Sequence, residues 1–234
     1  MTLRVFIGHD HRQPDACRVA ESTLRATSGI APEWLGFERL RDVGLLCRPT
    51  DRRGGVYDLI SNAPAATDFA ISRFLVPILC QSGWALFTDC DMVFLRDVND
   101  LGQVADERYA VMVVRHAHAP QETVKMDAQV QTAYPRKNWS SVVLWNCDHP
   151  ANRRLTLHDV NTRPGLWLHQ FRWLHDAEIG ELDPAWNWLV NVTPKPDDAA
   201  IAHYTLGVPM VPGYERSEHS ELWWNAHRLA LEGR

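Results

Sequence analysis

Two aspartates separated by one residue interrupt an otherwise continuous apolar stretch and are the first candidates for chemistry. Asp89 and Asp91 lie within WALFTDCDMVFL, residues 84–95. Burying unpaired carboxylates in such surroundings is costly. Two like charges held close together repel each other unless a cation lies between them, and carboxylate oxygens suit Mg²⁺ or Mn²⁺. The pair therefore predicts a metal site that could hold a diphosphate and take up its negative charge as it departs.

A metal held by two carboxylates needs a further protein ligand, and His203 is the best candidate. It follows a short apolar segment at 201–202, and imidazole binds Mn²⁺ acceptably. His116 and His118 also have the spacing of a metal pair, but the barrel hydrolases with that motif are usually longer chains, and the pair stays unassigned. The alternative is that the aspartates cap a strand and reach solvent and that the histidine is structural, since short motifs also arise by chance.

Hydrophobic periodicity predicts the elements that position these residues. We expect strands near 3–7, 34–37, 84–87, 109–114, 141–146 and 201–204, and helices over 14–26, 68–80, 150–160, 165–175 and 218–231. The opening order of strand, loop and helix is typical of parallel α/β folds, and it places His9 and Asp10 at the carboxyl end of the first strand, where ligands bind in open sheets. Strand alternation would turn Asp89 and Asp91 to one side and Cys90 into the core.

The rest of the chain is less regular. Apart from its one short strand, the stretch 28–65 is expected to be irregular, and 180–188 is expected to be a turn region. No repeat, low-complexity segment or convincing linker interrupts the sequence. We therefore predict a single α/β domain over residues 1–234.

Composition excludes several classes of protein. A net charge of −5 argues against nucleic-acid binding, which needs a basic face. The sequence has no apolar run of the ~18 residues that span a bilayer, and its start lacks a signal-peptide pattern, so the cytoplasm is the expected compartment. The five cysteines are scattered and form no CxxC pair, which favours reduced thiols.

Short blocks of sequence also occur in a recognisable order between residues 6 and 205. They are FIGHD at 6–10, AISRFLVP at 70–77, LFTDCD at 86–91, NWSSVVLWN at 138–146, LDPAWN at 182–187 and HYT at 203–205. Together they resemble glycosyltransferase family 8, a retaining group that includes glycogenin and bacterial lipopolysaccharide galactosyl- and glucosyltransferases. One block alone would be coincidence, whereas the ordered series covers most of the chain.

The resemblance implies a GT-A fold, which is a Rossmann-like domain with a mixed, mostly parallel sheet flanked by helices. It also implies a nucleotide-diphospho-sugar donor, most often linked to UDP, and Mn²⁺ (or Mg²⁺) as cofactor. The implied metal ligands are Asp89, Asp91 and His203. Gln170 would lie beside the reacting carbon as the catalytic residue. The implied donor-binding residues are His9, Asp10, Arg73, Asp89, Ser140, Ser141 and Gly207.

Some positions depart from the family pattern. The family's Asp-Gln-Asp appears here as His169-Gln170-Phe171, without either carboxylate. The lysine that often follows the closing histidine and binds diphosphate is missing, and its replacement could be Arg136, Lys137 or Arg216. These differences predict a divergent branch with an altered sugar pocket.

The expected function is therefore metal-dependent transfer of a sugar from a nucleotide-diphosphate donor to a saccharide, lipid or protein acceptor, with retention implied by the resemblance. One alternative is a binder of nucleotide sugars or carbohydrates that has the same fold and no activity. A second is a haloacid-dehalogenase-type phosphatase, although its motif normally opens the domain and continues with Gly-Thr. Trp223 and Trp224 in the last expected helix leave open a peripheral position on the inner membrane face. The sequence identifies neither the sugar nor the acceptor.

Overall fold

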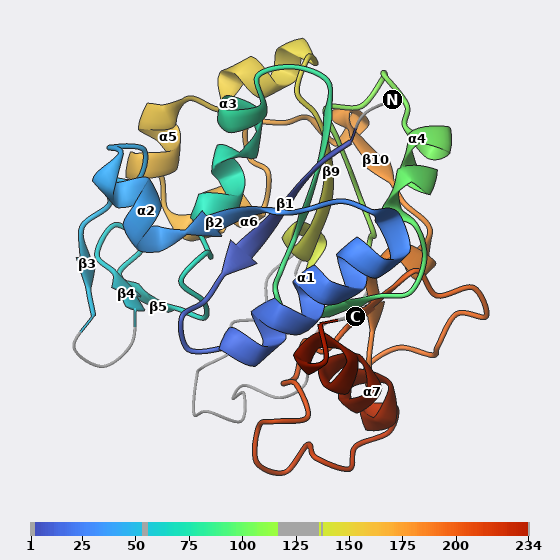
Figure 1. Cartoon of the computed structure of the whole chain (residues 1–234). Coiled ribbons are helices and arrows are strands. Elements are labelled where there is room, and N and C mark those ends of the chain that lie inside the picture. Colours follow the sequence, from blue (N-terminus) through green and yellow to red (C-terminus); the bar gives the residue numbers. More distant parts are fainter. Residues whose placement is uncertain (1–2, 53–55, 117–135, 137, 234) are drawn as a thin grey trace.

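The computed structural model describes residues 3–52, 56–116, 136 and 138–233 (Figure 1). Within them, six strands form the main sheet in the order β10-β8-β9-β6-β1-β2. They are β1 (Arg4–His9), β2 (Glu33–Gly36), β6 (Trp84–Thr88), β8 (Val111–Val113), β9 (Val142–Asn146) and β10 (Ile179–Glu181). Neighbours are parallel except at β9, which runs antiparallel to both β6 and β8. The predicted fold class, a mixed and mostly parallel sheet flanked by helices, is confirmed.

Helices and two small sheets surround the main sheet. The α-helices are α1 (Pro14–Ser28), α2 (Phe37–Asp42), α3 (Val76–Cys80), α4 (Leu101–Val104), α5 (Leu157–Thr162), α6 (Gly165–His169) and α7 (Ser220–Leu231). The 3-10 helices are η1 (Ser72–Leu75), η2 (Val98–Asp100), η3 (Trp139–Ser141), η4 (Pro150–Arg154), η5 (Asp176–Glu178) and η6 (Pro184–Asn187). One small sheet has the order β11-β12-β7, formed by Trp188–Leu189, Ile201–His203 and Met92–Phe94. The other has the order β3-β4-β5, formed by Thr50–Asp51, Val56–Asp58 and Ala63–Ala65.

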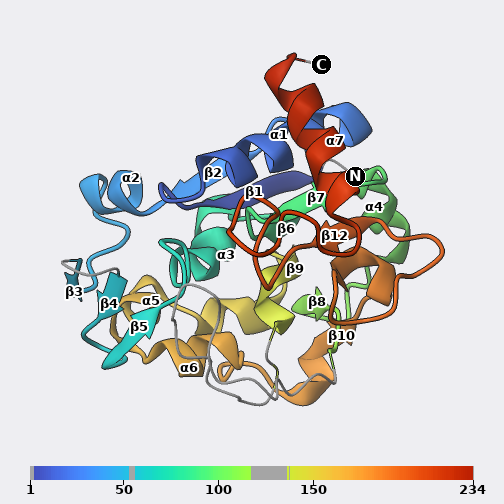
Figure 2. The same ribbon diagram turned by 90° about the horizontal axis from the view of Figure 1, so that it is seen from below.

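The direction of the crossovers explains why helices cover both faces of the main sheet. α1 carries the chain from β1 outward to β2, and η1 with α3 brings it back past β1 to β6. Crossovers between parallel strands are right-handed, so connections that run in opposite directions lie on opposite faces. Figure 2 shows α1 and α7 on one side of the sheet and α3, α5 and α6 on the other. α1 and α7 are in direct contact.

α1 illustrates how local sequence specifies these elements. Pro14 opens the helix, where its missing N–H is no loss, and Asp15 lies near the positive end of the helix dipole. The buried face repeats at helical spacing and packs against β7 and α7. Gly29 ends the helix with a φ of 67°, a left-handed conformation that glycine adopts without a Cβ clash.

The central strands β6 and β9 are buried almost throughout, because helices cover both faces of the sheet. Leu86, Phe87, Leu144 and Trp145 are each at most 1% exposed and form the middle of the core. All five cysteines fall in the described part of the chain, and none forms a disulfide. This agrees with the expectation of reduced thiols. Among the described residues, no helix is both long and apolar enough to cross a bilayer.

Several of the expected segments differ from the structure. The helix expected over 150–160 is η4 followed by the separate α5, and the helix expected over 165–175 is the shorter α6, which ends at His169. Residues 68–80 do not form one helix: a turn leads into η1 and the short α3, because the apolar side chains of this stretch are buried on several sides and not along one stripe. The expected turn region at 180–188 contains β10 and η6, and the expected irregular stretch at 28–65 contains α2 and the sheet of β3, β4 and β5. Strands of two or three residues are too short to produce a recognisable alternation.

Candidate active site

The candidate residues meet at the carboxyl end of β6, and strand pairing explains why. β1 and β6 are parallel neighbours, so Asp10 and Asp89, which follow them, lie beyond the same edge of the sheet. β9 runs antiparallel to β6, so Ser140 and Ser141, which precede β9, reach this edge from the opposite direction. The backbone N–H of Asp89 donates to the carbonyl of Ser141 at 3.0 Å and extends the pairing into the site.

A turn at Cys90 carries the chain from β6 into β7, which belongs to another sheet. Cys90 is 1% exposed, whereas the side chains of Asp89 and Asp91 are 14% and 20% exposed. The expectation that the cysteine lies in the core and the aspartates do not is met, although by a turn between sheets and not by strand alternation. β12 runs antiparallel to β7 with His203 opposite Met92, so the end of β12 brings His203 next to the acidic pair.

Asp89, Asp91 and His203 form a compact cluster of possible metal ligands. One ligand atom from each lies within 4.8 Å of those of the other two. The Nε2 atom of His203 is 3.5 Å from Oδ1 of Asp91, and the His203 side chain is 3% exposed. The structure therefore brings together the three residues for which the sequence predicts metal binding.

A buried asparagine contacts the second ring nitrogen of His203, the one that does not face Asp91. Its Nδ1 atom is 3.0 Å from Oδ1 of Asn187, which is fully buried at the end of η6. The Nδ2 atom of Asn187 donates to the hydroxyl of Ser141 at 3.0 Å, and that hydroxyl donates to the carbonyl of Asn138 at 2.7 Å. Asn187 closes the LDPAWN block, but the sequence alone assigns it no role, because its partners come from distant segments.

Arg73 connects the acidic pair to η3. Its Nη1 atom is 2.8 Å from Oδ1 of Asp89 and donates to the carbonyl of Ser140 at 2.7 Å. The guanidinium also lies 5.0 Å from the ring centroid of Phe87 and 5.3 Å from that of Phe69, within range of cation–π attraction. Arg73 is thus placed beside the cluster of possible metal ligands and pairs with Asp89.

His169 lies on the other side of Ser140. Its Nδ1 atom is 2.8 Å from the Ser140 hydroxyl, and its ring packs edge-on against Phe74. Burial, assisted by the charge of Arg73, lowers the pKa of His169 to about 3. The ring is therefore neutral at ordinary pH. The sequence shows only that a histidine replaces a carboxylate here, whereas the structure shows an uncharged group held against the predicted donor-sugar residue.

Gln170 is buried, and two arginines donate to its side-chain and backbone oxygens. Its Oε1 atom accepts from Nε of Arg172 at 2.7 Å, and its carbonyl accepts from Nη1 of Arg136 at 2.5 Å. Within the described part of the chain, no hydrogen bond or ion pair joins Gln170 to the acidic pair. Arg136, a candidate for binding diphosphate, donates to the carbonyl of Gln170 and forms an ion pair with Asp176. Lys137, the other nearby candidate for binding diphosphate, lies outside the described residues, as does His118.

The end of β1 holds a separate network of charges. Asp10 is fully buried and accepts hydrogen bonds from the backbone, Nε and Nη2 of Arg12. Burial would raise the pKa of Asp10, but the bonds from Arg12 outweigh this effect and hold it below its usual value. His9 packs edge-on against Trp34 with ring centroids 5.7 Å apart. Gly207 lies in the turn that follows β12 and has a φ of 145°, a conformation that favours glycine.

A second acidic group, formed by Asp10, His11 and Asp68, also has ligand atoms within 4.8 Å of one another. Here each carboxylate already has a guanidinium partner. Asp10 pairs with Arg12, and Asp68 accepts from Nη2 of Arg52 at 2.9 Å. The charges of these two carboxylates are therefore balanced by arginines of the protein itself.

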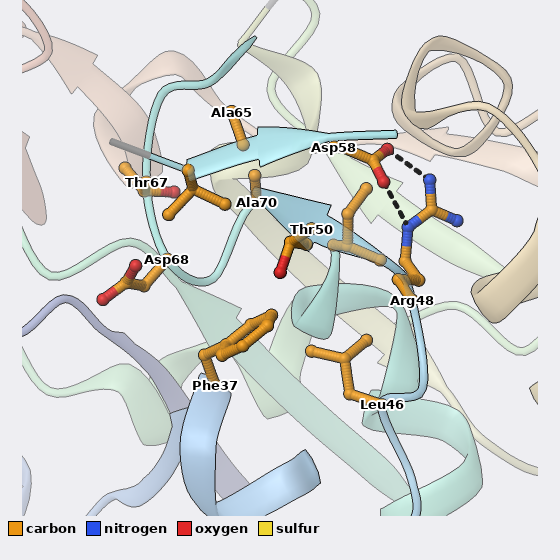
Figure 3. Close-up of a pocket in the computed structure, with 11 residues that line it drawn as sticks. Phe37, Leu46, Arg48, Thr50, Asp58, Ala65, Thr67, Asp68 and Ala70 are labelled. Atoms are coloured by element: carbon orange, nitrogen blue, oxygen red, sulfur yellow. Dashed lines mark hydrogen bonds and ion pairs between the residues drawn. The ribbon is translucent and has the colours of Figure 1, made fainter. Parts of the chain in front are cut away.

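Two hollows in the described part of the chain are not lined by the acidic pair. One is a cavity of about 10 Å³. It lies between α2 and the small sheet of β3, β4 and β5, with the Arg48–Asp58 ion pair at its wall (Figure 3). That volume is near the minimum for one water molecule and cannot hold a nucleotide. A polar hollow of about 260 Å³ lies beside β11 and is lined by Asn191, Val192, Thr193, Pro194, Lys195, Glu218 and His219.

Comparison with solved structures shows that the fold is similar to that of glycosyltransferases. Its structure aligns with the apo form of the glycosyltransferase GlyE of Streptococcus pneumoniae TIGR4 with a TM-score of 0.56 and 14% identity, covering 99% of this chain and 63% of GlyE. It aligns with the galactosyltransferase LgtC in complex with donor and acceptor sugar analogues with a TM-score of 0.54 and 13% identity, covering 96% and 95% of the two chains. The chain thus spans less than two thirds of GlyE but nearly all of LgtC. These likenesses establish the GT-A fold.

Sequence comparison identifies the family. No family model matches the chain. Protein CDI of Arabidopsis thaliana is 39% identical over 230 residues, which cover 95% of this chain and 85% of that protein. The chain belongs to the same family as Protein CDI.

Proposed function

We propose that this protein is a glycosyltransferase that depends on a divalent metal and takes its sugar from a nucleoside-diphosphate donor, with a UDP-sugar as the first donor to test. The carrying observation is the cluster of Asp89, Asp91 and His203 at the ligand-binding edge of a GT-A fold. The ordered sequence blocks further support a relation to glycosyltransferase family 8 and, with it, transfer with retention. We propose that residues 1–234 form one catalytic domain.

The cluster suits Mn²⁺ or Mg²⁺. It offers two carboxylates and one imidazole, a set of ligands that these hard cations accept. Arg73 pairs with Asp89 through Nη1, and a cation held by both carboxylates would reduce the repulsion between them. When bound, such a cation would neutralise the diphosphate and ease its departure. Ligand geometry within the protein is thus compatible with a resident metal.

The chain's own residues supply the rest of the proposed site. Arg73 is fixed by Asp89 and Ser140 and presents a guanidinium whose fork matches phosphate oxygens. Ser140 lies between Arg73 and the neutral ring of His169, so we propose that this segment borders the donor sugar. His9, Asp10 and Gly207 are proposed to line the nucleotide side, with Asp10 acting through Arg12, which occupies its carboxylate.

We propose that Gln170 contributes to the reacting centre through its amide N–H groups, because Arg172 occupies its oxygen. The same observation keeps a second function in view. Since the 169–171 segment lacks carboxylates and Gln170 bonds to arginines on both of its oxygens, a protein that binds nucleotide sugars without transferring them is the main alternative. The phosphatase alternative is weaker, because the acidic pair follows a strand inside a GT-A sheet and does not open the domain.

A thermal-shift screen of nucleotide sugars, with and without Mn²⁺, tests the proposal, because a ligand that binds only the native state stabilises it. We expect at least one nucleotide sugar to raise the melting temperature in the presence of Mn²⁺ and to have little effect in EDTA. The free nucleoside diphosphate should reproduce much of the shift. Equal shifts with and without the metal, or none with any nucleotide sugar, would contradict the proposal.

A further inference from the structure

The hydrogen bonds behind His203 point to a role for a residue outside the predicted site. We infer that Asn187 is a positioning residue that holds His203 as the tautomer able to bind a metal. The inference rests on the proposed metal site, because it concerns one of the three ligands. It is carried by the buried series of contacts from Asn138 through Ser141 and Asn187 to His203.

The direction of the series follows from the atoms that can donate. The Ser141 hydroxyl has one hydrogen, which it donates to the carbonyl of Asn138 at 2.7 Å. Ser141 must therefore accept from Asn187, whose Nδ2 lies 3.0 Å from its hydroxyl oxygen. This arrangement fixes the orientation of the amide, so its oxygen faces His203.

The fixed amide oxygen determines the state of the imidazole. It lies 3.0 Å from Nδ1 of His203 and can only accept, so Nδ1 must carry the hydrogen. A neutral imidazole has a single N–H, and Nε2 then presents its lone pair on the side of Asp91, 3.5 Å away. The opposite tautomer would carry its hydrogen on Nε2 and leave that nitrogen without a lone pair for a cation, with the remaining lone pair on Nδ1 facing the Asn187 oxygen.

The burial of these polar side chains suggests that they serve more than the stability of the fold. Asn187 is fully buried, His203 is 2% exposed and Ser141 is 4% exposed. Buried polar groups of this kind cost stability unless every one is satisfied, whereas apolar side chains of similar size would fill the same space. The arrangement matches the outer hydrogen bonds that orient histidine ligands in metal sites. Ser141 is thereby assigned to the support of the metal ligand.

The experiment compares two buried asparagines. Asn187→Ala removes the acceptor for Nδ1, and Asn187→Asp restores an acceptor. Asn152→Ala is the matched control, because Asn152 is 3% exposed and its side chain donates to the backbone carbonyls of Ala110 and Asn146, away from His203. The tautomer of His203 is read by ¹⁵N NMR of the metal-free protein, with His203→Gln to assign the signal. The affinity for Mn²⁺ is measured by electron paramagnetic resonance.

We expect the wild type to show the Nδ1–H tautomer and the Asn187→Ala variant to lose it. Affinity for Mn²⁺ should fall about 10–100-fold in Asn187→Ala, recover to within about threefold of wild type in Asn187→Asp, and stay unchanged in Asn152→Ala. An Nε2–H tautomer in the wild type, or unchanged affinity in Asn187→Ala, would overturn this inference alone. A wild type that binds no Mn²⁺ would overturn the metal site as well.

Discussion

Arg73 and Asp89 form an ion pair with 2.8 Å between Nη1 and Oδ1, and their side chains are only 6% and 14% exposed. The two members of the acidic pair are therefore not equivalent. Asp89 is held by an arginine that also bonds to η3, whereas Asp91 faces His203. The ion pair joins three segments at the end of β6, so it is expected to matter for stability as well as for ligand binding.

Removing Arg73 should leave the carboxylate of Asp89 without this ion-pair partner in a poorly solvated position. We expect Arg73→Ala, measured by denaturant unfolding in EDTA, to lower the free energy of unfolding by about 3 kcal/mol. Adding Asp89→Asn to that variant should cost less than the two separate changes together, with a coupling of about 1–2 kcal/mol. The exposed pair of Arg25 and Glu21 in α1 is the matched control, and its coupling should stay below about 0.5 kcal/mol. Strictly additive effects at Arg73 and Asp89 would refute the contribution of the buried pair.

The proposed metal site can be tested without any substrate. Asp91→Asn and His203→Ala should each weaken the binding of Mn²⁺, measured by isothermal titration calorimetry, by at least about tenfold, because the first removes the negative charge of a ligand and the second removes a ligand. Asp197→Asn, at an exposed position, serves as the control for a changed aspartate and should bind as the wild type does. Weaker binding in the control, or unchanged binding in both ligand variants, would show that the metal binds elsewhere.

The buried neutral His169 predicts a specific loss of stability in acid. Its pKa is lowered by burial to about 3 in the folded protein, whereas an unfolded histidine has a pKa of about 6.5. Between these values the unfolded chain binds the extra proton, so stability falls as the pH drops below about 6.5 and continues to fall toward about 3. At pH 5 this one group should cost about 2 kcal/mol relative to pH 7.5.

The variant His169→Gln should lack that part of the pH dependence. We expect its free energy of unfolding to fall by about 2 kcal/mol less than that of the wild type between pH 7.5 and 5, as measured by urea denaturation. His158→Gln, at an exposed position, is the control and should behave as the wild type does. Parallel curves for wild type and His169→Gln would show that His169 takes up its proton in the folded state.

Arg48 and Asp58 form a buried ion pair that we expect to serve the fold alone. Nε of Arg48 lies 3.1 Å from Oδ1 of Asp58, and the arginine also donates to the carbonyls of Val160 and Arg163 (Figure 3 shows the pair). Asp58→Asn should lower the free energy of unfolding by about 3 kcal/mol. Below the unfolding transition, its affinity for Mn²⁺ should equal that of the wild type. A marked change in that affinity would connect this region to the metal site.

Much of the fold could be predicted, because its central strands leave clear patterns. β6 and β9 are buried on both faces and appear as continuous apolar runs, and α1 has a proline start, an apolar face and a glycine end. The failures have physical causes. β10 has three residues and contains Gly180, so neither its length nor its composition distinguishes it from a turn. Most side chains of residues 68–80 are buried on several sides, so apolar residues are not confined to one helical face and their spacing does not show where the helices begin and end.

The candidate site was predictable as a set of residues but not as a set of contacts. The acidic pair stands out because carboxylates interrupt an apolar run, and His203 because it ends one. Asn187 and Ser141 are 46 positions apart, and Ser140 and His169 are 29 apart, so no local pattern reveals their hydrogen bonds. Chain topology brings them to one edge. The sequence also could not show that Asp10 is occupied by Arg12, because the aspartate's burial depends on the fold around it.

Turnover of a nucleotide sugar tests the central claim most directly. Release of nucleoside diphosphate from a panel of nucleotide sugars should be measured for the wild type and Asp91→Ala, with Mn²⁺ or EDTA and with a mixture of saccharide acceptors. We predict that the wild type releases nucleoside diphosphate from at least one donor, that EDTA abolishes the release, and that Asp91→Ala lowers its rate at least about 100-fold, since a metal can supply several kcal/mol of charge stabilisation. Near-normal turnover by Asp91→Ala, or donor binding by the wild type without turnover of any donor, would contradict the account.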